Sequence, residues 1–362
     1  MVAAHAPARH AAYYLVRAAV AAPSVYNTQP WRFISQNDEI ELHADLSRRL
    51  AVADPDGREM VISCGAALFN LRLAMRHLGF PPQVRLCPDP QQPWLLATVR
   101  WGRYARTTPD EEVMFAALPR RHTHYGPFQP DPLPVPLVGE LQRAARREGA
   151  ELSLMSGTED LRRLAQPIHA AETVRRSSTA HTTELANWTP PPGSARRDGL
   201  PAHTYPRDPD TSSFAGRDYA DQARLGHANQ HAAHLTLPAL GLVVLLNTGR
   251  DSLSDWLRAG QALQHVLLHA TAHHVVAGFH TQPLELPELR RQIRRTLAAG
   301  RRPQMILRLG YDNDVLPALR RPVSDVLIHG LGARARSLGE VGPVGPAPGP
   351  VRPSRGERTS VG

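Results

Sequence analysis

The spacing of hydrophobic residues is the first structural signal in this chain. Apolar positions three and four residues apart predict amphipathic helices, and short continuous apolar runs predict buried strands. Helical spacing predicts five helices, at residues 11–22, 64–78, 139–149, 158–174 and 255–276. A continuous apolar run predicts a buried strand at 242–247, and strands are also predicted at 94–101, 151–155 and 304–310. Two shorter apolar stretches, at 31–34 and around 39–43, lie between the first two helices.

The breaks in this pattern also carry information. Pro23 stops the first helix and Gly79 closes the second, as these residue types commonly do. Residues 187–236 are rich in Pro, Gly, Ser, Asp and Thr, which is typical of a lid or binding loop, or of a disordered insertion. From about Arg334 the chain is rich in Gly, Pro, Arg and Ser, and we expect a disordered tail.

An internal repeat links two of the predicted helices. Residues 64–74 read CGAALFNLRLA, and residues 259–270 read AGQALQHVLLHA. Aligning Gly65 with Gly260, an offset of 195 residues, also matches Ala67 with Ala262, Leu68 with Leu263 and Leu73 with Leu268. A predicted strand follows each helix some residues later. The repeat therefore predicts a duplicated α+β unit.

Composition places the chain among ordinary globular proteins. Its 362 residues suggest about two domains, and 42% of them are hydrophobic. Only two cysteines occur, Cys64 and Cys87, which excludes a disulfide scaffold and a thiolate zinc cluster. Because the chain has neither an apolar run of bilayer length nor a secretory signal pattern, we expect a cytoplasmic protein with no membrane partner.

The basic residues are unusual in kind. All 42 are arginine, and the net charge is +9. A GC-rich genome explains this bias, and no basic helix-turn-helix or aromatic RNA-binding strand accompanies it, so we expect no specific nucleic-acid partner. The lack of lysine excludes a Schiff base and a P-loop lysine. Any phosphate must therefore be bound by arginine or by backbone N–H groups.

The loop PSVYNTQPW, which runs from Pro23 to Trp31, is the most informative segment. Ser24, Asn27 and Gln29 place a hydroxyl and two carboxamides on a turn bracketed by prolines. Such groups suit a planar, uncharged ligand with alternating donors and acceptors. A helix-capping turn in which Trp31 anchors the core is the structural alternative.

This loop resembles the P-S-x-x-N-x-Q-P-W signature of the nitroreductase superfamily of FMN flavoproteins. The segments WLRAGQALQHVLLHAT, GFHTQPLELPELR, PQMILRLGY and RRPVSDVL follow in the order found in its actinobacterial Acg-like branch. The resemblance covers residues 11–331. It implies an α+β fold in which two antiparallel-sheet and helix units form a pseudo-dimer within one chain. The implied divisions are a first half at 1–109, a second half at 110–333 with a lid insertion at 187–236, and a tail at 334–362.

The resemblance also implies a single FMN site built from both halves, because the PSxxN loop and the Arg-rich motif RRHTHYGPF each occur once. Arg121, Arg320 and Arg321 would bind the phosphate, and the segment from Thr281 to Glu285 would run beside flavin N5. No side chain need act as the catalytic acid or base. A solvated arginine pair is the alternative for Arg320 and Arg321. The expected cofactor-binding residues are Ser24, Asn27, Gln29, Arg121, His122, Thr123, Tyr125, Gln282, Pro283, Leu284, Arg320 and Arg321.

The implied activity is NAD(P)H-driven reduction of quinone-like or nitroaromatic acceptors through hydride transfer at flavin N5. Tyr125 stands where the family commonly has a basic residue, which predicts a lower flavin reduction potential. The lid and Tyr125 together keep an alternative open, namely an FMN storage or sequestration protein with little turnover. We expect a monomer with an internal pseudo-dimer, and a further homodimer stays open.

Two groups of histidines fall at helical spacing. His227, His231 and His234 form one group, and residues 265, 269 and 273 form the other. Such spacing can bind zinc or nickel. Because no acidic partner pattern such as H-E-x-x-H accompanies either group, the sequence favours no metal site.

Overall fold

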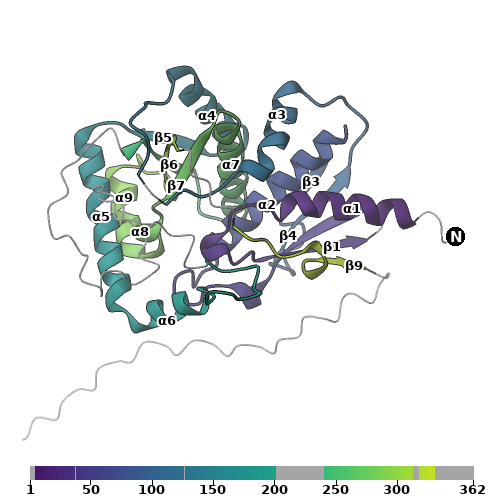
Figure 1. The fold of residues 1–362 in the computed structure, drawn as a ribbon, viewed down its shortest axis with the longest axis horizontal. Helices are drawn as coiled ribbons and strands as arrows, with labels where there is room; N and C mark the ends of the chain where they lie inside the picture. Colours follow the sequence, from purple (N-terminus) through teal and green to yellow (C-terminus); the bar gives the residue numbers. More distant parts are fainter. Residues whose placement is uncertain (1–4, 37, 126, 201–239, 313–317, 331–362) are drawn as a thin grey trace, which may run out of the picture. The chain divides into compact units, whose positions relative to one another are not determined.

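The computed structural model describes residues 5–36, 38–125, 127–200, 240–312 and 318–330 (Figure 1). Most of the predicted lid, the histidines at 227–234 and the predicted tail lie outside the described residues. The described part is a mixed helix and sheet fold, and residues 1–329 cluster as one unit. No described helix is both long enough and apolar enough to cross a membrane.

One sheet has five strands in the order β3-β4-β2-β1-β9. Neighbouring strands are antiparallel, except that β9 runs parallel to β1, with Leu327 opposite Phe33. A segment near the end of the described chain thus completes a sheet that begins near its start. The strand bounds are β1 Trp31–Gln36, β2 Glu39–Ala44, β3 Pro82–Leu86, β4 Leu95–Trp101 and β9 Leu327–His329.

The second sheet has four antiparallel strands in the order β5-β6-β8-β7. Beyond these strands, Thr123 forms an isolated parallel bridge with Ala277 of β7, so the segment around Thr123 runs along the edge of this sheet. The strand bounds are β5 Glu151–Met155, β6 Leu242–Thr248, β7 Val275–Phe279 and β8 Arg302–Tyr311.

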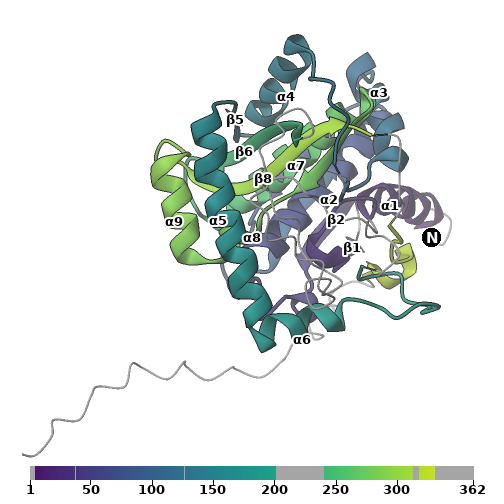
Figure 2. The same ribbon diagram turned by 60° about the vertical axis from the view of Figure 1, so that its left-hand side comes forward.

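Helices cover both sheets and separate them (Figures 1 and 2). Helices α1 and α2 pack on the five-stranded sheet through a core that includes Leu15, Phe33 and Leu68. Helices α4 and α7 cover one face of the four-stranded sheet, and α5, α8 and α9 cover the other. The helix bounds are α1 His5–Ala19, α2 Arg58–His77, α3 Pro109–Ala117, α4 Val135–Arg147, α5 Thr158–Ser177, α6 Thr179–Asn187, α7 Leu253–Ala272, α8 Gln282–Glu285 and α9 Pro287–Thr296.

Helices α2 and α7 cross closely at Gly65 and Gly260. A Cβ atom on Gly260 would lie 2.0 Å from the Ile62 carbonyl oxygen, and one on Gly65 would lie 2.3 Å from the Leu257 carbonyl oxygen. Each glycine therefore meets the carbonyl three residues before the other glycine. Only a residue without a side chain allows the two backbones this close.

The same reciprocity continues one turn further along both helices. The Phe69 ring lies 4.8 Å from the His265 ring, and Gln264 donates a hydrogen bond of 2.8 Å to Asn70. Under the 195-residue offset Phe69 corresponds to Gln264 and Asn70 corresponds to His265. Each of the two contacts is therefore the repeat-related copy of the other. An interface between two copies related by a two-fold axis has reciprocal contacts of this kind.

Several predicted helix boundaries are wrong, including those of the first helix, which is predicted at 11–22 and spans His5–Ala19. The helix predicted at 64–78 begins at Arg58, because the buried Asp54 carboxylate accepts hydrogen bonds from the backbone N–H groups of Glu59 and Met60 at 3.0 and 2.8 Å. The helix predicted at 255–276 ends at Ala272, and Val275 already lies in β7. Val275 and Val276 extend the apolar pattern past His273 and His274, which hides the change from helix to strand.

Candidate functional site

The PSVYNTQPW loop folds as a strained turn between α1 and β1. Tyr26, Asn27 and Gln29 have φ angles of 48°, 52° and 50°, in the left-handed region that side chains rarely adopt. The Ser24 hydroxyl accepts a hydrogen bond of 2.9 Å from the Gln29 backbone N–H and closes the turn. Such strain costs about 1–3 kcal/mol per residue, and it persists where surrounding contacts hold the backbone.

Asn27 and Gln29 bind the segment that follows residue 318. The Asn27 side chain donates to the Leu319 carbonyl at 3.0 Å, and its oxygen accepts from Arg320 Nη1 at 3.0 Å. The Gln29 side-chain oxygen accepts from the Arg321 backbone N–H at 2.8 Å. The structure therefore brings these predicted site residues together, although they are almost 300 positions apart.

The same two carboxamides also bind residues 197–199, the described start of the predicted lid. Asn27 Nδ2 donates to the Gly199 carbonyl at 3.1 Å, and Gln29 Nε2 donates to the Arg197 carbonyl at 2.8 Å. Gly199 has a φ of 77°, and a Cβ there would lie 2.5 Å from the Trp188 carbonyl oxygen. The loop thus joins the lid segment to the segment after residue 318.

Arg121 and Arg320 form a pair of cations that lack carboxylate partners among the described residues. Arg121 is 5% exposed, and among the described residues neither its Nε nor its Nη1 has a hydrogen-bond partner. The buried Nε of Arg320 has none either. Burial and the nearby charge of Arg320 lower the pKa of Arg121 to about 9, and burial lowers the pKa of Arg320 to about 10. Buried cations of this kind are costly unless an anion pairs with them.

The other predicted residues of the Arg-rich motif surround this pair. Burial lowers the pKa of His122, and the charges of Arg121 and Arg320 add to the effect. Tyr125 lies close enough to both arginines to influence their pKa values electrostatically. Thr123 holds the motif against β7 through its bridge to Ala277.

The predicted N5 segment follows the same strand. Gln282, Pro283 and Leu284 make up most of α8, which begins three residues after β7 ends, and all three are buried. The Arg-rich motif therefore lies along the edge of strand β7, and α8 follows the end of that strand.

Sequence reasoning missed Arg48, which fastens the lid segment. It donates to the Thr28 carbonyl at 2.5 Å and forms an ion pair with Asp198. Arg48 and Arg196 both lie against the Trp188 ring, 5.3 and 5.6 Å from its centroid. Nothing in the sequence marks Arg48 among 42 arginines, since its ion-pair partner Asp198 lies 150 residues away.

A second residue that the sequence did not indicate is Arg175 on α5. It donates a hydrogen bond to the Tyr26 hydroxyl. Its guanidinium also lies 3.6 Å from Glu172 and 3.5 Å from Glu285 of α8. Arg175 therefore connects the strained loop to the segment proposed to lie at flavin N5.

Comparisons with known proteins place this chain among nitroreductase relatives. A Mycobacterium tuberculosis protein named "Putative NAD(P)H nitroreductase Rv3131" is 32% identical over 330 residues, which cover 89% of this chain and 92% of that protein. Another protein of the same organism, named "Putative NAD(P)H nitroreductase acg", is 27% identical over 318 residues, covering 86% and 93%. A search of protein-family models found no match.

Among solved structures, the FMN-dependent nitroreductase NfnB from Mycobacterium smegmatis, in complex with NADPH, aligns with a TM-score of 0.37 and 16% identity. The alignment covers 59% of this chain and 96% of that one. A nitroreductase with bound FMN from Bacteroides fragilis aligns with a TM-score of 0.35 and 12% identity, covering 58% and 93%.

Proposed function

The chain belongs to the nitroreductase family, as its 32% identity across nearly the whole length of a relative shows, and on that premise we propose that it is an FMN-dependent oxidoreductase. NAD(P)H would supply the electrons, and a quinone-like or nitroaromatic compound would accept them. The observation that carries the proposal is the arginine pair, Arg121 and Arg320, which has buried N–H groups without an acceptor in the described part of the chain.

The pair fits the phosphate of FMN. Three buried N–H positions find no partner among the residues that the structure describes, namely Nε and Nη1 of Arg121 and Nε of Arg320. A phosphate dianion offers acceptor oxygens for all of them, and each charge-assisted hydrogen bond contributes about 1.5–3 kcal/mol. Arg321 adds positive charge, although its guanidinium already donates to the carbonyls of Gln29 and Asp325. The Thr123 hydroxyl is the proposed neutral donor.

The remaining residues would orient the cofactor and leave the chemistry to it. Bound FMN supplies a ring that accepts hydride at N5, so no acidic or basic side chain is needed. Ser24, Asn27 and Gln29 stand at the proposed ribityl and ring side, and Gln282, Pro283 and Leu284 at the N5 side. His122 and Tyr125 flank the arginines. The buried α8 would keep water from the reacting edge.

We further propose that the two halves, 1–109 and 110–333, correspond to two fused subunits of a family dimer. The reciprocal contacts of α2 and α7 at Gly65 and Gly260 support this proposal. The PSVYNTQPW loop belongs to one half, and the arginines belong to the other. Because each occurs once, we expect one FMN per chain.

A second candidate function is FMN storage with little turnover. The observation that favours it is the fastening of residues 188–200 over the loop by the Arg48–Asp198 ion pair and by hydrogen bonds from Asn27 and Gln29. Tyr125 in place of a cation would also make reduction of the flavin harder. Both candidates use the same arginine pair.

Flavin titrations test the phosphate role. Arg320→Gln should raise the FMN dissociation constant by about 10- to 150-fold, which corresponds to one lost bond of about 1.5–3 kcal/mol. Arg121→Gln removes two proposed bonds and should raise the dissociation constant by at least as much. Riboflavin, which lacks the phosphate, should bind these variants and the wild type equally. Arg100→Gln is the matched control, because Arg100 is a surface arginine paired with Glu39. Equal FMN affinity in all four proteins would refute the assignment.

Anaerobic addition of NADPH to the FMN-loaded protein separates the two candidates. Loss of the oxidised flavin absorbance within the mixing time, followed by turnover with a quinone, supports the oxidoreductase. A flavin that dithionite reduces but NADPH does not reduce supports storage. A colourless protein that FMN cannot reconstitute would exclude both.

A further inference from the structure

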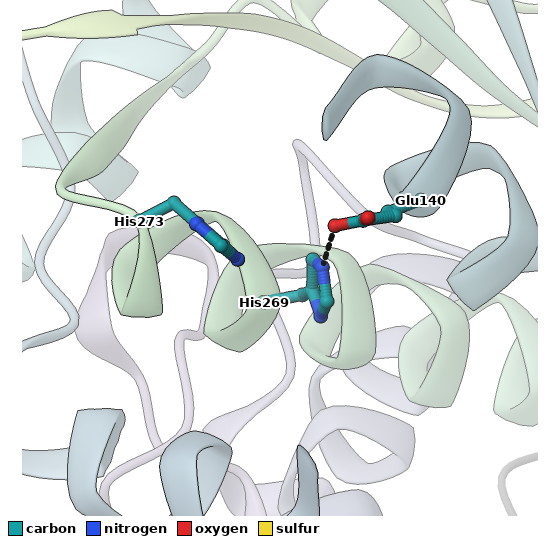
Figure 3. A group of neighbouring side chains, drawn as sticks. All are labelled: Glu140, His269 and His273. Carbon is teal, nitrogen blue, oxygen red and sulfur yellow. Dashed lines mark hydrogen bonds and ion pairs between the residues drawn. The ribbon is translucent and has the colours of Figure 1, made fainter. Parts of the chain in front are cut away.

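Three side chains on two packed helices form a cluster remote from the proposed flavin residues. Glu140 belongs to α4, and His269 and His273 lie one turn apart near the end of α7. Figure 3 shows Glu140 reaching toward the two histidines, with His269 directly opposite its carboxylate. Glu140 and His269 are partly buried, whereas His273 is exposed, so the cluster is accessible from solvent.

The geometry is close to that of a three-ligand metal site. His269 Nε2 lies 3.0 Å from a Glu140 carboxylate oxygen, and the two imidazole rings lie 5.1 Å apart. One ligand atom from each residue can be chosen so that all three lie within 4.8 Å of one another. Tetrahedral zinc with bonds of about 2.1 Å separates its ligand atoms by about 3.4 Å. Rotation of the exposed His273 side chain can bring its ring nitrogen most of the way from the observed separation to the one that zinc requires.

We propose that Glu140, His269 and His273 bind one zinc ion, with water at the remaining position. Two imidazole nitrogens and a carboxylate oxygen are a common zinc ligand set, and histidines at i and i+4 share one helix face. The sequence favoured no metal here because no acidic partner stood near the histidines. The partner comes instead from α4, 129 positions away.

Neighbouring charges are compatible with this assignment. The Glu140 carboxylate faces the His269 imidazole at 3.0 Å. Arg143 approaches the same carboxylate at 3.8 Å, but its side chain is exposed and can move away. His265, one turn before His269 on α7, contacts Glu148 instead. Glu148 also forms an ion pair with Arg72 at 2.6 Å.

A bound ion would connect α4 to α7, the helix that crosses α2 at Gly260. It would therefore stabilise the second half of the chain without any part in electron transfer. This role makes the site testable independently of flavin binding, because zinc binding and thermal stability can be measured on the same FMN-loaded protein.

The test is a zinc titration of untagged, EDTA-treated and dialysed full-length protein by isothermal titration calorimetry. We expect one tight equivalent per chain and a zinc-dependent rise in melting temperature. Glu140→Gln, His269→Ala and His273→Ala should each abolish the tight equivalent and the thermal shift. His273 is exposed, so His273→Ala decides the matter if another variant fails to fold by circular dichroism.

Two control variants complete the design. His77→Ala removes a histidine that pairs with Glu112 at 2.9 Å in a two-residue arrangement, and it should keep the tight equivalent. The triple variant His227→Ala, His231→Ala and His234→Ala should keep it as well. The proposal would be overturned by any of three results: the wild type does not bind zinc tightly, the three ligand variants still bind it tightly, or either control loses tight binding.

Discussion

Replacing Gly260 with alanine should separate the two central helices. The added Cβ would lie 2.0 Å from the Ile62 carbonyl oxygen, 2.8 Å from Gly65 Cα and 2.9 Å from the Ala66 backbone nitrogen. Carbon and oxygen atoms in contact normally lie about 3.3–3.6 Å apart. All three neighbours are backbone atoms, so no side-chain rotation can relieve the clash. The helices must instead move apart by more than about 1 Å.

Two effects of opposite sign decide how much Gly260→Ala changes the free energy of unfolding. Alanine favours the helical state over glycine by about 0.8–1.0 kcal/mol. Overpacking in a closely packed interior costs about 1–3 kcal/mol, and occasionally more when backbone must shift. Because the Gly260 contact is far shorter than van der Waals distance, we expect the upper end of that cost. The predicted outcome is a net destabilisation of about 2 kcal/mol.

Gly139→Ala is the matched control. Gly139 also lies within a helix, α4, but a Cβ there would meet only Arg143 Nη1, at 3.5 Å. This variant should gain about 0.5–1 kcal/mol from helix propensity alone. Urea unfolding followed by circular dichroism compares both variants with the wild type. Unchanged or increased stability of Gly260→Ala, beside a stabilised Gly139→Ala, would refute the close-crossing argument.

Three further variants probe the charged groups. Burial by itself raises the pKa of Asp251, but hydrogen bonds, led by that from Arg290, lower it to about 2. The ionised carboxylate should therefore add about 2 kcal/mol to the free energy of unfolding above about pH 4. This contribution should be lost as the pH falls toward about 2. Asp251→Asn should show a smaller loss of stability between neutral and acid pH in urea melts, and an unchanged acid profile would contradict this. Asp198→Asn should release residues 188–200 from Arg48, measured as faster proteolysis and faster FMN dissociation, and rates equal to the wild type would exclude the fastening role. Tyr125→Arg should raise the flavin reduction potential in a dye-equilibration assay, and an unchanged potential would remove Tyr125 from the flavin environment.

Local sequence patterns predicted the elements whose periodicity is self-contained. The apolar run ELSLM predicted β5 at its observed bounds, and strand β4 and helix α4 were found with small shifts. The match of Gly65 with Gly260 identified the two helices that cross at the centre. Edge strand β3, where burial alternates only weakly over Pro82–Leu86, has no comparable signal and was missed.

The sequence alone indicated helices α1, α2, α4, α5 and α7 and strands β4, β5, β6 and β8. It also indicated the repeat around Gly65 and the family motif at Ser24 and Asn27, because each of these features is written within a few neighbouring residues. Only the tertiary structure decided which distant groups meet. Arg320 reaches Asn27 across 293 positions, and Glu140 reaches His269 across 129. No local period encodes such pairings, since they follow from how the sheets and helices pack. The candidate phosphate site and the candidate zinc site both depend on that packing.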